Sequence, residues 1–170
     1  MGGNVGRRLL TLLAAGALAS ACGGDDATTD ELGLGGDVLA AIAAVEADLG
    51  GGQEFFEVTA TAPLTNVFVA IDGATAAVPY VFLDGELQAP APTLTGAEGF
   101  TFTAEDVDFD PDAILSQVTD ELPEATIEAL SVEGGEGGLV RYVASVRSQV
   151  GGVIEVTLGP DGAVLAVDPL

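Results

Sequence analysis

The chain lacks the side chains on which most enzyme chemistry depends. Among its 170 residues there is no histidine, no lysine and no tryptophan, and there is a single cysteine. Without histidine, Ser-His-Asp and Cys-His nucleophilic machinery and most zinc sites are excluded; without lysine, so are Schiff bases and Ser-Lys dyads. A catalytic pair of carboxylates of the glycosidase type is still compatible with the sequence, although few aromatic residues could stack on a sugar. We therefore expect no enzymatic activity.

Positive charge is nearly absent as well. All 27 acidic residues follow Cys22, where the cations are Arg141 and Arg147 alone, so this part of the chain carries a net charge of −25. Nucleic acid is excluded as a partner, because phosphate binding needs cations that displace counterions. Anionic lipid head groups would be repelled too. The charge favours solubility, cationic partners or Ca²⁺.

The apolar run near the N-terminus is too short to span a membrane. Residues 9–21 would measure about 20 Å as a helix, whereas a span takes about 20 residues. With Arg7 and Arg8 before it and small residues after it, the run predicts a signal peptide over residues 1–21. The residues around the two arginines do not extend a twin-arginine motif, which favours the general secretory route.

The sequence LASAC, which ends at Cys22, resembles the lipobox of bacterial lipoproteins, with Ala19 where the usual motif has a larger aliphatic residue. The resemblance implies that the thiol of Cys22 carries a diacylglycerol and becomes the first residue of the mature chain. Two acyl chains suffice for stable anchoring, so we expect the protein at the outer face of the cell membrane. Ordinary secretion after Ala-Ser-Ala is the alternative. Residues 22–36, rich in glycine and acids, are then a flexible tether.

Two units with the same order of elements are predicted after the tether, over residues 37–88 and 105–170, with a connection over residues 89–104. Each begins with an amphipathic helix and continues with alternating strands. The expected fold class is α+β, with two similar helix-plus-antiparallel-meander units in tandem. We expect the chain to be monomeric.

The bounds of these elements follow from capping residues and turns. The first helix is expected to start at the N-cap Asp37 and to stop at Gly50; the second starts at Pro111, capped by Asp110, and stops at Pro123. Pro79 cannot donate to a strand ladder, so its strand is expected at an edge or a bulge. The predicted strands cover residues 54–61, 65–71, 76–83, 125–133, 139–147, 153–158 and 163–167.

Residues 111–168 resemble the PepSY domain in three stretches. These are AILSQVTDELPEATIEAL, a helix that ends in Leu-Pro and enters a strand; VRYVASV, a strand with a central tyrosine; and VIEVTLGPDGAVLAV, two strands around an acidic glycine turn. PepSY-like domains occur in exported proteins and lipoproteins, and in propeptides where a role in restraining peptidases has been proposed. The resemblance implies an extracytoplasmic binding or regulatory module without catalytic residues, in a lipoprotein of the high-GC Gram-positive type.

Acidic residues alternate just before the second helix, and hard oxygen ligands in this spacing resemble the start of a calcium loop. An EF-hand, however, requires glycine at Pro111 and glutamate at Gln117. In the alternative interpretation the carboxylates are structural, with Asp110 as the helix cap and Asp112 near the positive helix end. The candidate metal ligands are Asp106, Asp108, Asp110 and Asp112, next to Glu105.

Three functions remain compatible with the sequence. The leading hypothesis is a non-enzymatic, lipid-anchored binding or peptidase-inhibitory module without a resident cofactor, acting on a protein partner. The second is an amphiphile carrier, and the third a calcium-binding or purely structural surface lipoprotein. In a carrier, the seven phenylalanines would line a pocket between sheet and helices: Phe55, Phe56, Phe68, Phe82, Phe100, Phe102 and Phe109.

Overall fold

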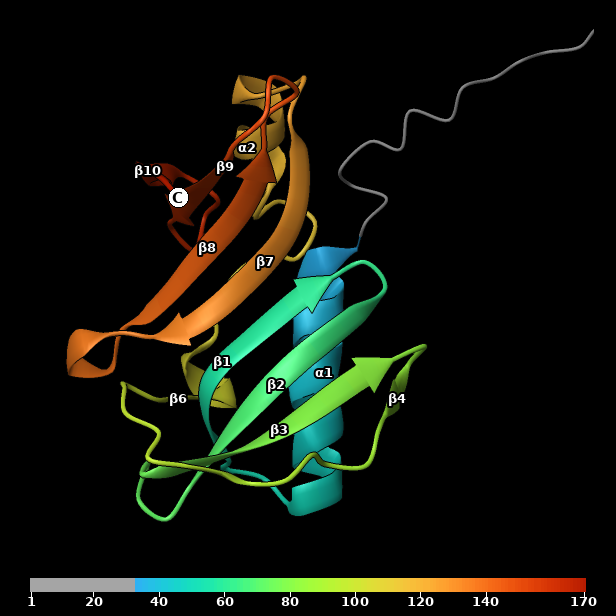
Figure 1. The fold of residues 1–170 in the computed structure, drawn as a ribbon, viewed down its shortest axis with the longest axis vertical. Coiled ribbons are helices and arrows are strands. Elements are labelled where there is room, and N and C mark those ends of the chain that lie inside the picture. The colour runs from blue at the N-terminus through green and yellow to red at the C-terminus, as the bar shows by residue number, and fades with distance from the viewer. Residues whose placement is uncertain (1–32) are drawn as a thin grey trace, which may run out of the picture.

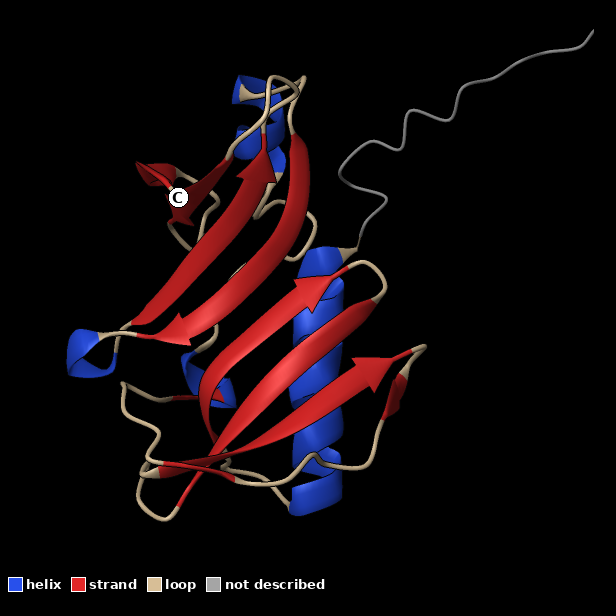
Figure 2. Ribbon diagram, in the orientation of Figure 1, coloured by secondary structure: helices blue, strands red, loops and turns tan. Residues whose placement is uncertain are grey.

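The computed structural model describes residues 33–170, which form a ten-stranded sheet with the helices α1 and α2 against one of its faces (Figures 1 and 2). Short 3₁₀ turns, η2 (Ala104–Asp106) and η3 (Glu136–Gly138), lie in connections. The helices are α1 (Leu34–Leu49) and α2 (Ser116–Glu121). The strands are β1 (Glu54–Thr61), β2 (Leu64–Ile71), β3 (Ala76–Leu83), β4 (Glu86–Leu87), β5 (Leu94–Thr95), β6 (Phe102–Thr103), β7 (Thr126–Gly134), β8 (Val140–Arg147), β9 (Val153–Leu158) and β10 (Val164–Pro169).

The strands lie in the order β10-β9-β8-β7-β1-β2-β3-β4, and β5 and β6 add short pairings to β3 and β1. All of these pairings are antiparallel. The strand β1 pairs with β2 on one side and with β7 on the other, where residues 57–61 match residues 129–133. Both predicted units thus belong to one continuous sheet, and the β1–β7 pairing is the seam between its halves.

The core lies between the sheet and the helices. Along α1 the residues at helical spacing face the strands, because apolar side chains three and four positions apart share one side of a helix. The short α2 adds Val118, and the turn before it adds Ile114 and Leu115. The buried apolar residues of α1 are Leu34, Val38, Ala41, Ile42 and Val45.

The first helix begins four residues before the predicted start, since its N-cap is Gly33 and not Asp37. The N–H of Asp37 donates to the carbonyl of Gly33 at 2.8 Å, so Asp37 lies inside the first turn. The reason is Leu34, which extends the apolar stripe by one turn and is 2% exposed. The last residues of the predicted tether, 34–36, therefore belong to the helix. The predicted stop at Gly50 is confirmed.

The second helix is shorter than predicted. Residues 111–115 form turns, and α2 itself starts at Ser116. The hydroxyl of Ser116 donates to the carbonyl of Ala113 at 2.7 Å, and such side-chain hydrogen bonds compete with regular helix formation. Asp110 caps the preceding turn, since its Oδ1 accepts the N–H of Asp112 at 3.0 Å.

The predicted strands agree with the structure to within two residues at each end, and the α+β class is confirmed. β3 is not the last strand of the sheet, since β4 and β5 pair with its two ends, but Pro79 lies opposite Phe68 of β2 in the stretch between these pairings, where no strand pairs with the outer side of β3. Val143 alternates with Arg141 and Arg147 along β8 and is nevertheless 5% exposed. Both halves show a helix followed by a meander, but that they are a tandem repeat stays a prediction.

Candidate functional site

The predicted anchor lies outside the described part of the chain. Cys22, the signal peptide 1–21 and residues 22–32 of the tether all precede Gly33. Their roles therefore stay predictions. Between residues 33 and 170, no helix combines the length and the apolarity that crossing a membrane requires.

The four aspartates of the predicted calcium site do not form a ligand cluster. Within residues 33–170, no three acidic or cysteine side chains come close enough together to hold a metal ion. Asp106 Oδ2 instead accepts the backbone N–H and the hydroxyl of Thr103, each at 2.8 Å, and these hydrogen bonds lower the pKa of Asp106. Asp110 binds the N–H of Asp112. The structure thus favours structural roles for Asp106 and Asp110, but not the predicted helix cap: the N-cap of α2 is Leu115, so Asp110 does not cap this helix and Asp112 lies outside its first turn, while Asp106 belongs to the capping box of η2.

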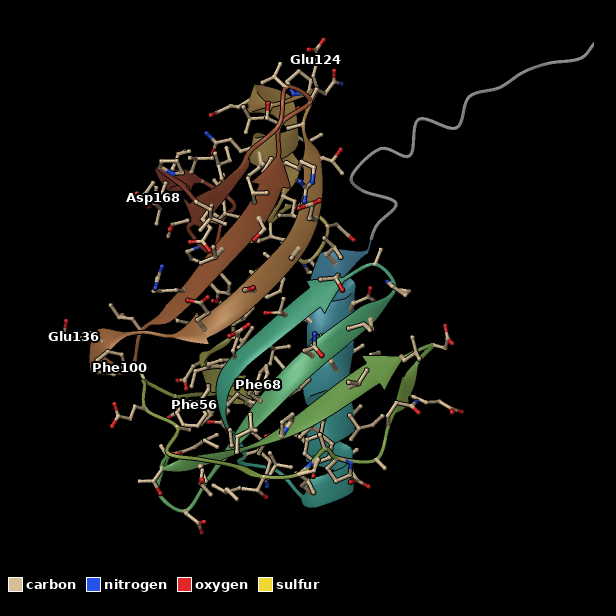
Figure 3. The ribbon with its side chains drawn as sticks, in the orientation of Figure 1. Phe56, Phe68, Phe100, Glu124, Glu136 and Asp168 are labelled. Atoms are coloured by element: carbon tan, nitrogen blue, oxygen red, sulfur yellow. The ribbon has the colours of Figure 1, made fainter. Side chains whose placement is uncertain are left out.

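The phenylalanines are divided between the two faces of the sheet, so they do not line one common pocket. Phe55 and Phe102 are buried in the core with their ring centroids 5.7 Å apart. Phe109 packs edge-on against Tyr142, with a centroid distance of 5.3 Å. On the face opposite the helices, or exposed at its border, lie Phe56, Phe68 and Phe100 (Figure 3).

The face opposite the helices carries a row of side chains that crosses the seam. Neighbouring strands place Pro79, Phe68, Glu57, Glu133 and Arg141 opposite one another, on β3, β2, β1, β7 and β8. No helix of residues 33–170 covers this open face, which is turned toward the viewer in Figure 1. Along the row, apolar side chains give way to acidic ones and then to an arginine.

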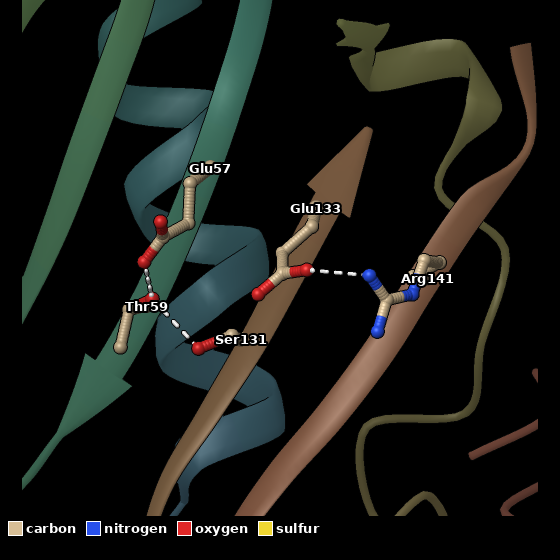
Figure 4. A network of polar contacts seen from close by, with 5 residues as sticks. All are labelled: Glu57, Thr59, Ser131, Glu133 and Arg141. Carbon is tan, nitrogen blue, oxygen red and sulfur yellow. Dashed lines mark hydrogen bonds and ion pairs between the residues drawn. The ribbon is translucent and has the colours of Figure 1, made fainter. Parts of the chain in front are cut away.

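A polar network occupies the open face at the seam (Figure 4). The hydroxyls of Thr59 and Ser131 share a hydrogen bond of 2.8 Å across β1 and β7, and Thr59 also donates to Glu57. Glu133 Oε2 lies 3.4 Å from Arg141 Nη1. Glu57 and Glu133 are opposite each other, and like charges in this position repel. The network therefore both links the halves and places two acids side by side.

Glu133 shows how this neighbourhood acts on an acid. Partial burial raises the pKa of Glu133 above its ordinary value of 4.5, against the opposing effect of Arg141, and the negative charges of Glu57 and Glu155 raise it further. The seam is thus a place where an added cation would be favoured electrostatically.

A groove of about 330 Å³ opens next to the apolar end of the row. Two phenyl rings and two carboxylates contribute to it, and Phe56 and Phe68 are labelled in Figure 3. Its carboxylates come from β1 and from the connection after β5. The groove is lined by Phe56, Glu57, Phe68, Ala77 and residues 94–98.

Two local features build the groove. The register of β1 against β2 shifts between Phe55 and Glu57, and this bulge directs the consecutive residues Phe56 and Glu57 to the open face. Gly134 admits the connection that leads away from the groove, since a Cβ there would lie 2.3 Å from the carbonyl oxygen of Phe100. Bulges often re-aim side chains beside functional sites.

Sequence reasoning included Phe56 and Phe68 among the pocket candidates but missed Glu57, Glu98 and Glu133. The available signal is the run Glu-Phe-Phe-Glu at residues 54–57, which interrupts the strict alternation of a strand. The position of Glu98 had no local signal, because it depends on where the connection crosses the sheet.

A second hollow, of about 500 Å³, lies at the end of the second half, between the end of α2 and the turn from β8 to β9. Val150 on that turn is 95% exposed. A smaller hollow of about 100 Å³ adjoins it, and both share Glu121, Leu122 and Ile154. The larger one is lined by residues 121–125, Val146, residues 148–150 and Ile154.

Comparison with known proteins assigns no family to this arrangement. No family model matches the chain, and no curated protein matches it significantly. The resemblance of residues 111–168 to PepSY domains stays a prediction.

Proposed function

We propose that the protein is an exported, lipid-anchored module that binds a protein partner and catalyses no reaction. The observation that carries the proposal is the open sheet face, where the groove of Phe56 and Phe68 adjoins the acids of the seam. Apolar surface rimmed by polar groups is typical of protein interaction sites. A PepSY-like role, such as restraint of a peptidase, is the regulatory form of this proposal.

The side chains on the open face support binding rather than catalysis. Glu133 is paired with Arg141, and Glu57 accepts a hydrogen bond from Thr59. The sequence offers no histidine or lysine that could act as a general base or nucleophile beside them.

The experiment that tests the anchor is the mass of the mature protein made from the full gene in a high-GC Gram-positive host. We expect the mass of the chain from Cys22 onward plus one diacylglycerol, and recovery in the membrane fraction. The Cys22→Ser variant is the control and should lack both the increment and the membrane association. A wild-type chain released without acyl groups would contradict the proposed anchoring.

Turnover is the matching test for the absence of catalysis. The purified mature protein is expected to leave peptide, ester and glycoside substrates unchanged. A measurable turnover that a single substitution such as Glu133→Gln abolishes would overturn the proposal.

An amphiphile carrier is the second candidate, because of the hollow of about 500 Å³ at the end of α2. Leu122, Val146 and Ile154 provide it with apolar walls. Native mass spectrometry of protein released in mild detergent separates the candidates, since a carrier retains a lipid as additional non-covalent mass and a binding module does not.

A further inference from the structure

We propose that the groove at Phe56 and Phe68 receives a lysine or arginine side chain from a basic polypeptide. The inference rests on the proposed function, because it specifies the chemistry of the partner that the open face binds. It follows from the lining of the groove, from its size and from the charges of the chain itself.

The aromatic part of the groove suits the long stem and the charge of such a side chain. Phe56 and Phe68 provide ring surface on which the methylene groups of lysine or arginine can lie. A cation close to a phenyl face is also attracted by the quadrupole of the ring. A neutral aliphatic side chain would gain the first interaction and not the second.

The charged part of the groove is acidic only. Glu57 and Glu98 are among its lining residues, and no arginine is. Glu57 lies next to Glu133 in the row across the seam, and the one arginine of this row, Arg141, lies beyond Glu133 and is paired with it. An incoming ammonium or guanidinium group therefore meets an excess of negative charge.

The size of the groove fits a side chain better than a whole ligand. Its volume of about 330 Å³ is near the lower end of the range of about 300–1,000 Å³ for sites that enclose small molecules. A single long side chain with its flanking backbone on the open face is the occupant that matches both the volume and the exposed position.

A second copy of the chain cannot supply this side chain as readily. After Cys22 the sequence has no cationic side chains except Arg141 and Arg147. Arg141 is paired with Glu133, and Arg147 donates to both carboxylate oxygens of Glu128, with 3.0 Å between Nη2 and Oε2. Self-association through the groove would break one of these pairs, whereas a basic partner brings its own cation.

The test uses the purified mature chain in detergent and blocked alanine–serine peptides that differ only in one central residue. The central residue is lysine, arginine, norleucine or glutamate. Binding is followed by NMR through the amide shifts of residues 56–57, 68 and 94–98. We expect saturable shifts with lysine and arginine, affinity about tenfold lower for norleucine, and no saturable shift with glutamate.

Variants locate the effect in the groove. Phe56→Ala and Glu98→Gln should each weaken binding of the lysine peptide several-fold. Glu86→Gln on β4 removes the same charge outside the groove lining and should leave the affinity unchanged. Raising the NaCl concentration from about 50 mM to about 500 mM should weaken binding of the lysine peptide and leave binding of the norleucine peptide unchanged.

Three outcomes would overturn the inference: equal affinity for lysine and norleucine, an equal loss on Glu86→Gln, or no shift in the groove with any peptide. They are distinguishable from a failure of the proposed function. An inert groove on a chain that carries diacylglycerol at Cys22 refutes the cation site alone. A chain that binds the lysine peptide but lacks the lipid, or turns over a substrate, refutes the proposed function alone.

Discussion

The two halves of the sheet differ in how far their helix covers it. In the first half, α1 has 16 residues and buries five apolar side chains against the strands. In the second half, α2 has six residues, and Val118 is its one buried residue. Large apolar side chains exposed in the second half, from α2 onward, include Leu122, Val150, Leu165, Val167 and Leu170.

The difference shows where each half has surface left for binding. The helix face of the first half is closed, so its groove lies on the opposite, open face. In the second half the short α2 leaves part of the helix face of the sheet uncovered. Both hollows beside Leu122 and Ile154 lie on this uncovered part. Helix length, rather than strand content, decides which face remains accessible.

The largest expected effect comes from comparing Val38→Ala in α1 with Val118→Ala in α2. Both valines are buried, and each change removes about 1.5 kcal/mol of transfer free energy plus a cavity term. We expect the free energy of unfolding to fall by about 2–3 kcal/mol for Val38→Ala and by about 1.5–2 kcal/mol for Val118→Ala, measured in urea. Val118 already borders a hollow, where neighbours have room to relax. Equal losses would show that the halves are equally well packed.

A second test concerns the contact between α1 and the second half. A Cβ at Gly35 would lie 2.5 Å from the carbonyl oxygen of Pro111, whereas a Cβ at Gly36 would meet nothing within 4 Å. Gly35→Ala is expected to lower the free energy of unfolding by about 1–3 kcal/mol. Gly36→Ala is its control and should raise it by about 0.5–1 kcal/mol through helix propensity. A gain at both positions would mean that the helix end does not approach Pro111.

The smallest expected effect belongs to the seam. Because burial raises the pKa of Glu133, folding favours its protonated form; the resulting stability is present below its unfolded pKa and is lost as the pH rises through the folded pKa. The variant Glu133→Gln resembles the protonated form. It should therefore raise the melting temperature at pH 7, by less than about 3 °C, and leave the melting temperature at pH 3.5 unchanged. The charged side chains that act on the Glu133 carboxyl are Arg141, Glu57 and Glu155.

Glu128→Gln provides the matched control within the second half. Glu128 accepts two hydrogen bonds from Arg147 and lies on β7 outside the residues 129–133 that pair with β1. Its substitution should give no gain in melting temperature at pH 7. A loss of stability with Glu133→Gln at pH 7 would mean that the pair with Arg141 outweighs burial and repulsion.

Local patterns were sufficient to predict most strands. The strands 54–61, 76–83 and 153–158 have the predicted bounds, because alternating apolar residues and flanking turn residues are local properties. The same patterns could not predict the length of α2. There residues 111–115 form turns, with the hydroxyl of Ser116 donating to the carbonyl of Ala113, although the apolar spacing alone would start the helix at Pro111.

The seam and the groove could not be predicted, since both depend on distant residues. Nothing in the sequence around Thr59 indicates that Ser131 will lie beside it. In the groove, Phe56 and Glu98 come together only because the connection between the halves returns across the sheet. Thr59, Ser131 and Glu98 have no distinctive local sequence, and the pairing of β1 with β7 and the path of the connection bring them to the seam and the groove.

The central pairing of the sheet also has a consequence for how the chain folds. Thr59 and Ser131, joined across the seam, are 72 positions apart. Since the strands of a chain exported as proposed emerge in sequence order, β1 reaches the folding compartment before β7. Until β7 arrives, an edge in the middle of the future sheet has unpaired N–H and C=O groups, the kind of surface that aggregates or recruits chaperones. Truncations between the halves should leave this edge open permanently.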